Sequence, residues 1–230
     1  MAVRISMKEH AGVSVPAGGQ WLHGQFGSPA RPRGLVLLAH DGAGGERDVS
    51  SRVATALERR GFATLAVELL TPDDAAIEAR MAHSRFAVTM LAARFLSVID
   101  WAKARPHTGR LPIGLFGAHA GGAAALTAAA LRPREVAAVI SCSGPLDLLG
   151  PVLPDVDAPA LLIVGALDAA ALRAHREALS RFRTDAVLDV VPDALSLESD
   201  AAVRTIADLA KEWFGRHLVR ETERQWGLTA

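Results

Sequence analysis

Short apolar runs alternate with longer amphipathic stretches through most of the chain, and this alternation restricts the fold more than any other feature of the sequence. The run Leu35-Val36-Leu37-Leu38-Ala39 contains no polar residue, which is typical of a strand that helices bury on both faces. Less pure runs of the same kind follow at residues 63–69, 111–116, 136–140, 160–164 and 186–191. Parallel strands need crossover connections, which are usually helices. The alternation therefore predicts an α/β fold with a mostly parallel central sheet and helices on both faces.

Four helices and an N-terminal hairpin are expected around this sheet. The helices are predicted at residues 47–60, 84–104, 120–131 and from about 199 onward. The first should stop at Gly61, because a glycine can close the last turn in a left-handed conformation. Residues 12–15 and 20–26 flank Pro16-Ala17-Gly18-Gly19, whose glycines allow positive φ angles. These two segments are therefore predicted to form an antiparallel hairpin.

The charge balance and the cysteine content argue against several classes of protein. Among 230 residues, 25 Lys and Arg stand against 25 Asp and Glu, so the chain lacks the positive surplus of proteins that bind nucleic acids or anionic membranes. One cysteine, Cys142, cannot form an internal disulfide or a thiolate zinc site. No apolar run approaches the ~18 residues of a membrane span, and the N-terminus has no signal-peptide core. We therefore expect a single cytoplasmic domain over residues 1–230.

The segment Gly117-Ala118-His119-Ala120-Gly121 joins a predicted buried strand to an alanine-rich helix. It is the G-x-S-x-G pattern of a nucleophile elbow with one change at its centre. Glycines two residues before and after the central position allow a sharp turn, so the central side chain projects above the sheet. That side chain is His119. Because ligands of parallel sheets bind at the carboxyl ends of the strands, the functional site is expected here.

Around this elbow the chain resembles the dienelactone-hydrolase-like group of the α/β hydrolases, over nearly its whole length. The resemblance includes His40-Asp41-Gly42-Ala43-Gly44, a loop of the His-Gly type, and Glu68-Leu69-Leu70-Thr71-Pro72. It also includes Leu161-Leu162-Ile163-Val164-Gly165-Ala166-Leu167-Asp168, and it implies that Asp168 is the acid of a catalytic triad. In the family a histidine follows the last strand in a phrase like Pro-Gly-Ala-Thr-His-Leu, where this chain has Pro192-Asp193-Ala194-Leu195-Ser196-Leu197. The resemblance implies the α/β-hydrolase fold.

Two triad positions differ from the pattern of the family. His119 stands at the position of the nucleophile, and Ser196 stands at the position of the usual histidine. In acyl transfer an imidazole activates the hydroxyl and a carboxylate orients the imidazole, so the loss of a triad member lowers the rate by several orders of magnitude. Ordinary ester hydrolysis is therefore expected to be weak or absent, and the site is expected to serve another use.

A second interpretation keeps the site catalytic. If the loops meet as they do in the family, Ser196 serves as nucleophile and His119 as base in a working hydrolase for a small substrate. The orienting carboxylate would be Asp41, which stands where the loop of the family usually has glycine, or Asp168. Drift in a site released from selection is the competing interpretation of this cluster.

Further residues are expected to support the site. The backbone N–H groups of Ala120 and Gly42 are predicted to form an oxyanion or anion-binding hole, which depends on the fold more than on side chains. An Asp41 carboxylate beside His119 would favour the imidazolium form, so small carboxylates or other anions are the expected ligands. Hydrogen-bonding roles near the entrance of the site are assigned to His40, Glu68 and His83.

No cofactor and no bound metal are expected, because the spacing of His119, Asp41 and Asp168 matches no zinc motif. Cys142 is expected to be a small buried residue away from the elbow. Four prolines punctuate the short segment at 143–159, so no large lid is expected and the pocket should suit a small molecule. The expected partner is a small-molecule substrate or ligand, with no nucleic acid and no membrane, and the chain is expected to act as a monomer or homodimer.

Two other classes of function remain open. A noncatalytic ligand-binding or interaction protein can use the same scaffold. A nucleotide-binding domain is suggested by Gly42-Ala43-Gly44-Gly45, which follows a buried strand, and by Glu68 near the end of the next strand. That interpretation fails in detail, because the position of the third glycine holds Arg47 and the elbow has no role in it.

Overall fold

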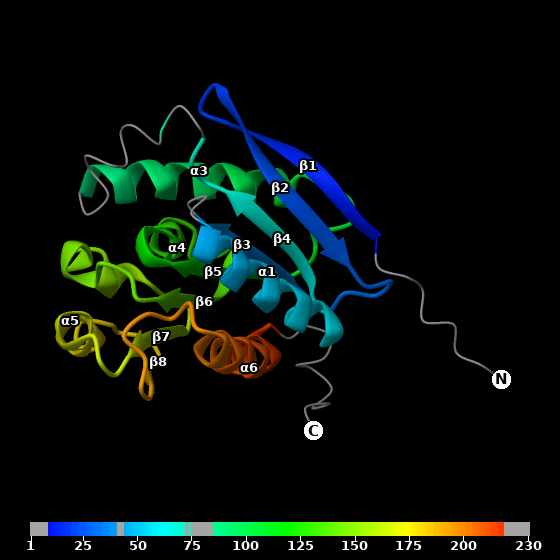
Figure 1. Ribbon diagram of the computed structural model, residues 1–230. Helices are drawn as coiled ribbons and strands as arrows, with labels where there is room; N and C mark the ends of the chain where they lie inside the picture. The colour runs from blue at the N-terminus through cyan, green and yellow to red at the C-terminus, as the bar shows by residue number, and fades with distance from the viewer. Residues whose placement is uncertain (1–8, 41–43, 72–73, 75–84, 219–230) are drawn as a thin grey trace.

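The computed structural model describes residues 9–40, 44–71, 74 and 85–218, and its centre is an eight-stranded sheet (Figure 1). The strands are β1 (Glu9–Ala17), β2 (Gln20–Ser28), β3 (Leu35–His40), β4 (Ala63–Glu68), β5 (Ile113–Ala118), β6 (Val136–Cys142), β7 (Ala160–Gly165) and β8 (Ala186–Val191). The helices are α1 (Gly44–Arg59), α3 (Arg85–Lys103), α4 (His119–Leu131), α5 (Ala169–Leu179) and α6 (Asp200–His217), with short 3-10 turns η2 (Leu146–Leu149) and η3 (Leu153–Asp155). The strand order is β1-β2-β4-β3-β5-β6-β7-β8, and all neighbours from β4 to β8 are parallel. The predicted α/β class is confirmed.

Strand β3 shows why the central strands are apolar throughout. Its residues from Leu35 to Ala39 are fully buried. Successive side chains point to opposite faces of the sheet. Leu37 therefore joins the core beneath α3 and α4, whereas Val36 and Leu38 join the core beneath α1 and α6. A polar residue at any of these positions would face one core or the other.

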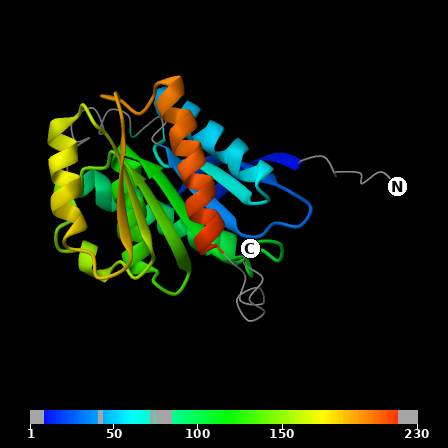
Figure 2. The ribbon, with the colours of Figure 1, turned by 90° about the horizontal axis from the view of Figure 1, so that it is seen from below.

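The helices form two layers. Helices α1 and α6 lie side by side on one face of the sheet, and α3, α4 and α5 cover the other face (Figures 1 and 2). Helix α6 begins where the sequence predicts, because the hydroxyl of Ser199 accepts a hydrogen bond from the N–H of Ala202 at 3.2 Å and caps the first turn. None of the helices in the described ranges combines the length and the apolar character that crossing a bilayer requires.

The N-terminal hairpin extends the sheet beyond β4. Gly18 and Gly19 have φ angles of +58° and +86°, as a two-residue turn between twisted strands requires. Strands β1 and β2 pair along their full length, and β2 continues antiparallel to β4. The predicted hairpin is confirmed; β1 is longer than expected at both ends, and β2 is longer at its C-terminal end.

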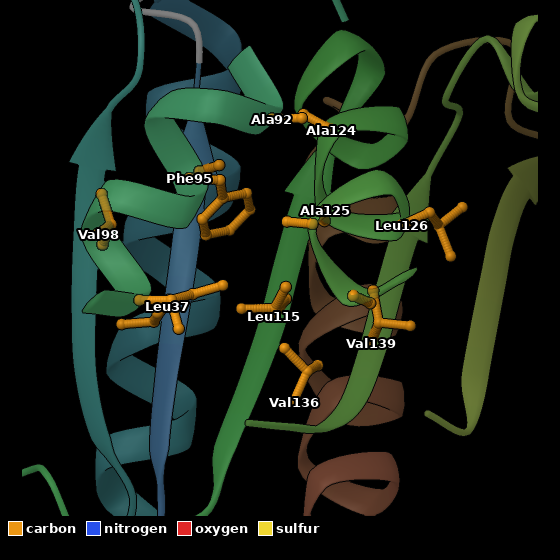
Figure 3. Close-up of a cluster of buried hydrophobic side chains, with 14 of the residues drawn as sticks. Leu37, Ala92, Phe95, Val98, Leu115, Ala124, Ala125, Leu126, Val136 and Val139 are labelled. Carbon is orange, nitrogen blue, oxygen red and sulfur yellow. The ribbon is translucent and has the colours of Figure 1, made fainter. Parts of the chain in front are cut away.

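Helices α3 and α4 pack through small side chains (Figure 3). Ala92 of α3 lies beside Ala124 of α4, and the ring of Phe95 points toward Ala125. Methyl groups at this contact allow the backbones of the two helices to approach closely. Helix α4 also lies close to the sheet, because a Cβ on Gly122 would be 2.6 Å from the hydroxyl oxygen of Ser141.

Some element boundaries differ from those predicted. The strand expected from residue 111 begins at Ile113, because the N–H of Leu111 closes a turn onto the carbonyl of Thr108. Helix α1 begins at Gly44, three residues earlier than expected. Helix α5 is not predicted at all. It buries only His175 and Ala178, so its apolar stripe is too sparse to mark it in the sequence.

Candidate active site

Strand β5 turns into α4 at His119, whose φ angle is +45°. A residue other than glycine rarely adopts this left-handed conformation. The turn is tight, since a Cβ on Gly117 would lie 2.2 Å from the carbonyl oxygen of Gly121. The structure thus contains the sharp strand-to-helix turn that the glycine spacing predicts. The half-buried imidazole of His119 stands at its apex.

A hollow beside His119 has a volume of about 10 Å³, which is room for about one water molecule. Cys142 and Ser143 line it from the end of β6, and Leu197 and Glu198 line it from the loop before α6. The hollow is completed by Val49, Ala118 and Ile206. Its volume has room for one small group of a ligand.

The loops that carry Asp168 and Ser196 are hydrogen-bonded to each other. The N–H of Leu167 donates to the carbonyl of Ala194 at 2.9 Å. A Cβ on Gly165 would lie 2.3 Å from the same carbonyl oxygen, so this close packing requires glycine there. Asp168 and Ser196 follow Leu167 and Ala194 by one and two residues, so the bond holds both positions at the same end of the sheet.

The side chains of Asp168 and Ser196 make local contacts. One carboxylate oxygen of Asp168, Oδ1, accepts from the N–H of Ala171 at 2.9 Å and caps α5. Ser196 is exposed, and its hydroxyl oxygen accepts from the N–H of Glu198 at 3.3 Å. Among the described residues, the lining of the hollow includes its neighbour Leu197 but not Ser196.

The remaining predicted site residues are placed only in part. Three of them lie outside the described residues, namely Asp41, Gly42 and His83. His40 ends β3, where its backbone is in register with Glu68 of β4. Glu68 is half-buried. It lines a larger groove between α1, β2 and β4 and not the hollow beside His119. Ala120 is the second residue of α4, so its N–H belongs to the first turn, which has no partner within the helix. Within the described ranges, no three His, Cys, Asp or Glu side chains are grouped so as to hold a metal ion.

A model of the dienelactone hydrolase family matches residues 22–195 of this chain. The chain belongs to the dienelactone hydrolase family. The match includes the elbow and Asp168, and it ends one residue before Ser196.

Solved structures agree with this membership. The dienelactone hydrolase from Anabaena variabilis is 38% identical to this chain, with a TM-score of 0.85 over 92% of this chain and 99% of that one. Est1E from Butyrivibrio proteoclasticus shares the fold at 15% identity, with a TM-score of 0.73 over 89% of this chain and 98% of that one. An α/β serine hydrolase without a lid from Xanthomonas campestris does so at 19% identity, with a TM-score of 0.71 over 93% of this chain and 97% of that one. The predicted α/β-hydrolase fold is confirmed.

A longer relative occurs in Mycobacterium tuberculosis and carries the provisional name phosphoribosyl transferase. It is 39% identical over 208 residues, which are 90% of this chain and 46% of that protein. The chain therefore spans less than half the length of this relative.

In this member of the dienelactone hydrolase family, the polar residues Ser143 and Glu198 line the hollow although they were not predicted as site residues. Ser143 has a φ angle of +48°, and its N–H donates to the carbonyl of Ile163 at 2.8 Å. Ser143 directly follows β6. Because ligands of parallel sheets bind at the carboxyl ends of the strands, this position could have indicated a site residue. Glu198 follows Ser196 by two residues, and no motif marks it.

Cys142 is buried, as expected, but it lines the hollow beside His119 and does not lie away from the elbow. Burial raises the pKa of its thiol. The thiol therefore stays protonated, and the thiolate that would act as a nucleophile is not formed.

His175 is a structural histidine. It is fully buried in α5, and its Nδ1 lies 2.7 Å from the carbonyl oxygen of Ala171, to which it donates. Burial lowers the pKa of this imidazole, although the bond to Ala171 and the charge of Asp168 oppose the change. His175 therefore remains neutral and takes no part in the hollow beside His119.

A buried ion pair fixes the chain after β4. Arg94 of α3 donates to both carboxylate oxygens of Asp74, at 2.5 and 3.1 Å, and to the carbonyl of Leu69 at 2.6 Å. Thr71 donates to Asp74 through its backbone N–H at 2.7 Å and through its hydroxyl at 2.6 Å. The side chains of Asp74 and Arg94 are only 6% and 11% exposed. The hydrogen bond from Arg94 is the main cause that lowers the pKa of Asp74 to about 2.

Replacing Asp74 by asparagine should remove a part of the stability that depends on pH. The folded-state pKa of about 2 lies below the ordinary value of 3.8, so the carboxylate stabilises the fold above about pH 4 and this contribution disappears as the pH falls toward 2. The difference corresponds to about 2 kcal/mol. Urea unfolding should therefore show a gap in free energy between wild type and Asp74→Asn that narrows by about this amount between about pH 6 and about pH 2.

Asp100→Asn is the matched control. Asp100 pairs with Arg132 at 3.2 Å, but their side chains are 61% and 32% exposed, so its loss should change the stability little at either pH. A constant gap between wild type and Asp74→Asn across this pH range would contradict the role assigned to the buried pair.

Proposed function

We propose that the site of this chain binds a small carboxylate and does not hydrolyse esters through a serine nucleophile. The observation that carries the proposal is His119 at the apex of the elbow, held at a φ angle of +45°. An imidazole there supplies a hydrogen-bond donor and, when protonated, a positive charge at the position where a serine hydrolase needs a hydroxyl.

The first turn of α4 adds donors next to this imidazole. The N–H groups of the first helical turn have no intrahelical partner, and Ala118 at the N-cap provides no side-chain hydrogen bond. The N-terminus of a helix is also the positive end of its dipole. One oxygen of a carboxylate fits the volume of the hollow beside His119, which the exposed Glu198 also lines, while the remainder of the ligand stays outside it.

The contacts do not support the alternative in which Ser196 attacks and His119 acts as the base. The hydroxyl of Ser196 accepts a hydrogen bond from Glu198 in its own loop. The carboxylate of Asp168 accepts one from the first turn of α5. Neither contact orients an imidazole or activates a hydroxyl, so carboxylate binding is the function put forward.

The transferase activity in the name of the Mycobacterium relative is not carried over to this chain. The matched part is 46% of that protein. This chain has the dienelactone hydrolase fold along the matched length, so we infer that the name refers to the remainder of the relative.

A cytoplasmic location is proposed as well, supported by the presence of one cysteine in 230 residues.

Titration of benzoate into the ¹⁵N-labelled protein should shift the amide signals of His119 and Ala120. His119→Gln keeps a hydrogen-bond donor but removes the imidazole, so it should weaken binding about tenfold, as the loss of a hydrogen bond to a charged group does. His107→Gln changes an exposed histidine in the turn after α3 and should bind benzoate like the wild type. Chemical-shift titration measures all three affinities.

The wild type should neither hydrolyse short p-nitrophenyl esters nor react with a fluorophosphonate probe. Covalent labelling at Ser196 would establish the exchanged arrangement, and labelling at Ser143 would identify that residue as a nucleophile. Either result contradicts the proposal. Equal benzoate affinity in the wild type and His119→Gln would contradict the part of the proposal that concerns carboxylate binding.

A further inference from the structure

A second cavity, which we call the α1 groove, lies between α1 and the strands β2 and β4 and has a volume of about 280 Å³. Helix α6 flanks α1 on one side, and the hairpin strands lie beyond its other side (Figure 1). The groove and the hollow beside His119 share no lining residue. An occupant of the groove therefore does not depend on the function proposed for the elbow.

The wall that β2 and β4 form has its side chains in register. Gln25 of β2 is paired with Ala66 of β4, and Gly27 is paired with Thr64, so these four positions share one face of the sheet. That face is the one turned toward α1, because Gln25, Thr64 and Ala66 line the groove together with residues of the helix.

Glu58 of α1 is held in place at the base of this wall. The residue is 6% exposed, and one of its carboxylate oxygens, Oε1, accepts a hydrogen bond from the hydroxyl of Thr64 at 2.8 Å. A Cβ on Gly27 would lie 2.1 Å from this oxygen, so the glycine of β2 leaves the space that the carboxylate occupies. The fold thus holds the carboxylate of Glu58, a hydrogen-bond acceptor, in the lining of the groove.

Ser50 supplies the observation that points to a ligand. Ser50 is one of the residues that line the groove, it is fully buried, and its hydroxyl has no hydrogen-bond partner among the described residues. A buried hydroxyl without a partner is unfavourable. A polar molecule in the groove would satisfy it.

We propose that the α1 groove binds a small polyhydroxylated compound, neutral or cationic and of monosaccharide size. The volume lies near the lower end of the range for small-molecule sites. Hydroxyl side chains supply groups that both donate and accept, and two carboxylates supply acceptors. These groups are Ser50, Ser51, Thr55, Thr64, Glu58 and Glu68.

The charges and the apolar part of the lining narrow the class of ligand. Among the described residues that line the groove there is no lysine or arginine, so a carboxylate or phosphate finds no fixed cation there. Ala54 and Ala66 form a small apolar patch against which the C–H groups of a sugar ring can pack. The donors of a ligand hydroxyl or ammonium group match the carboxylates of Glu58 and Glu68.

Three probes of matched size and different charge test this proposal. Glucosamine, glucose and glucuronate are titrated separately into the ¹⁵N-labelled full chain, and the amide shifts of residues 50–58 and 64–68 are followed. Glucosamine and glucose should shift these signals, and glucuronate should bind at least about tenfold more weakly because it brings a carboxylate to a groove that Glu58 and Glu68 already line. No response to any of the three probes, or equal binding of glucuronate, would overturn the proposal.

Matched variants separate binding in the groove from changes in the fold. Ser50→Ala removes the buried hydroxyl and should weaken glucosamine binding about fivefold, whereas Ser97→Ala, on the outer surface of α3, should leave it unchanged. Ala66→Leu fills the groove and should abolish the shifts, while Ala93→Leu at an exposed position should not. Circular dichroism confirms the fold of each variant. Equal affinities for Ser50→Ala and Ser97→Ala would show that the groove is not the binding site.

Discussion

The double variant His119→Ser/Ser196→His should hydrolyse p-nitrophenyl acetate at least about 100-fold faster than either single variant. His119→Ser alone places a hydroxyl at the apex of the elbow but provides no base. Ser196→His alone provides an imidazole but no hydroxyl. Members of a triad act as a unit, so their effects are strongly non-additive.

The backbone supports this expectation at both positions. The apex of the elbow already has the φ angle of +45° that projects its side chain above the sheet. The loop with Ser196 is tied to the loop with Asp168 by the bond from Leu167 to Ala194. Leu197, the next residue, borders the hollow beside His119. We expect an imidazole at position 196 to reach both Asp168 and the elbow.

Ester turnover and fluorophosphonate labelling of the four proteins measure the outcome. Addition of Asp168→Asn to the double variant should remove most of the gained activity, because the acid orients the imidazole. If the two single variants are as active as the double variant, then Ser196 does not occupy the position of the family histidine.

Gly117→Ala should destabilise the protein by about 3 kcal/mol, near the upper end of the usual cost of overpacking. The new Cβ would lie 2.2 Å from the carbonyl oxygen of Gly121 and 2.7 Å from the nitrogen of Gly122. Both neighbours are backbone atoms, so the start of α4 must move away from β5. Urea denaturation followed by circular dichroism gives the free energy of unfolding.

Gly215→Ala provides the opposite case in the same experiment. This glycine lies inside α6, and a Cβ there would meet nothing within 4 Å. Alanine favours the helix, so this variant should be stabilised by about 0.5–1 kcal/mol. A stability of Gly117→Ala close to that of the wild type would mean that the elbow is not packed as tightly as the described contacts require.

The sheet was predictable from the sequence because its central strands are buried on both faces. A strand such as β3 has no exposed side, so it appears as an uninterrupted apolar run. Helix α5 was not predictable in the same way, since it buries only His175 and Ala178 and its other faces are polar or half-exposed. The order of strands was also not predicted, because nothing in the sequence shows that β2 pairs with β4.

The elbow could be predicted because its residues are consecutive and its glycines have a direct steric function. Asp168 and Ser196 were expected in the site from phrases that resemble the family, and their roles stay predictions. The ion pair of Asp74 and Arg94 has no such signal, since the two residues are 20 positions apart and only the fold brings them together. The α1 groove is hidden for the same reason, because three separate elements contribute its lining.

Helix α4 gives the site a support with very little conformational freedom. Its eight buried residues are two glycines, five alanines and one leucine, Leu126. Glycine and alanine have no side-chain rotamers to lose, so ordering this surface costs almost no side-chain entropy. For the same reason, the layer beneath His119 cannot repack around a bulkier ligand. Among the described parts of the site, the loops that carry Ser143 and Leu197 also border the hollow, and they have side chains that can adapt to a ligand.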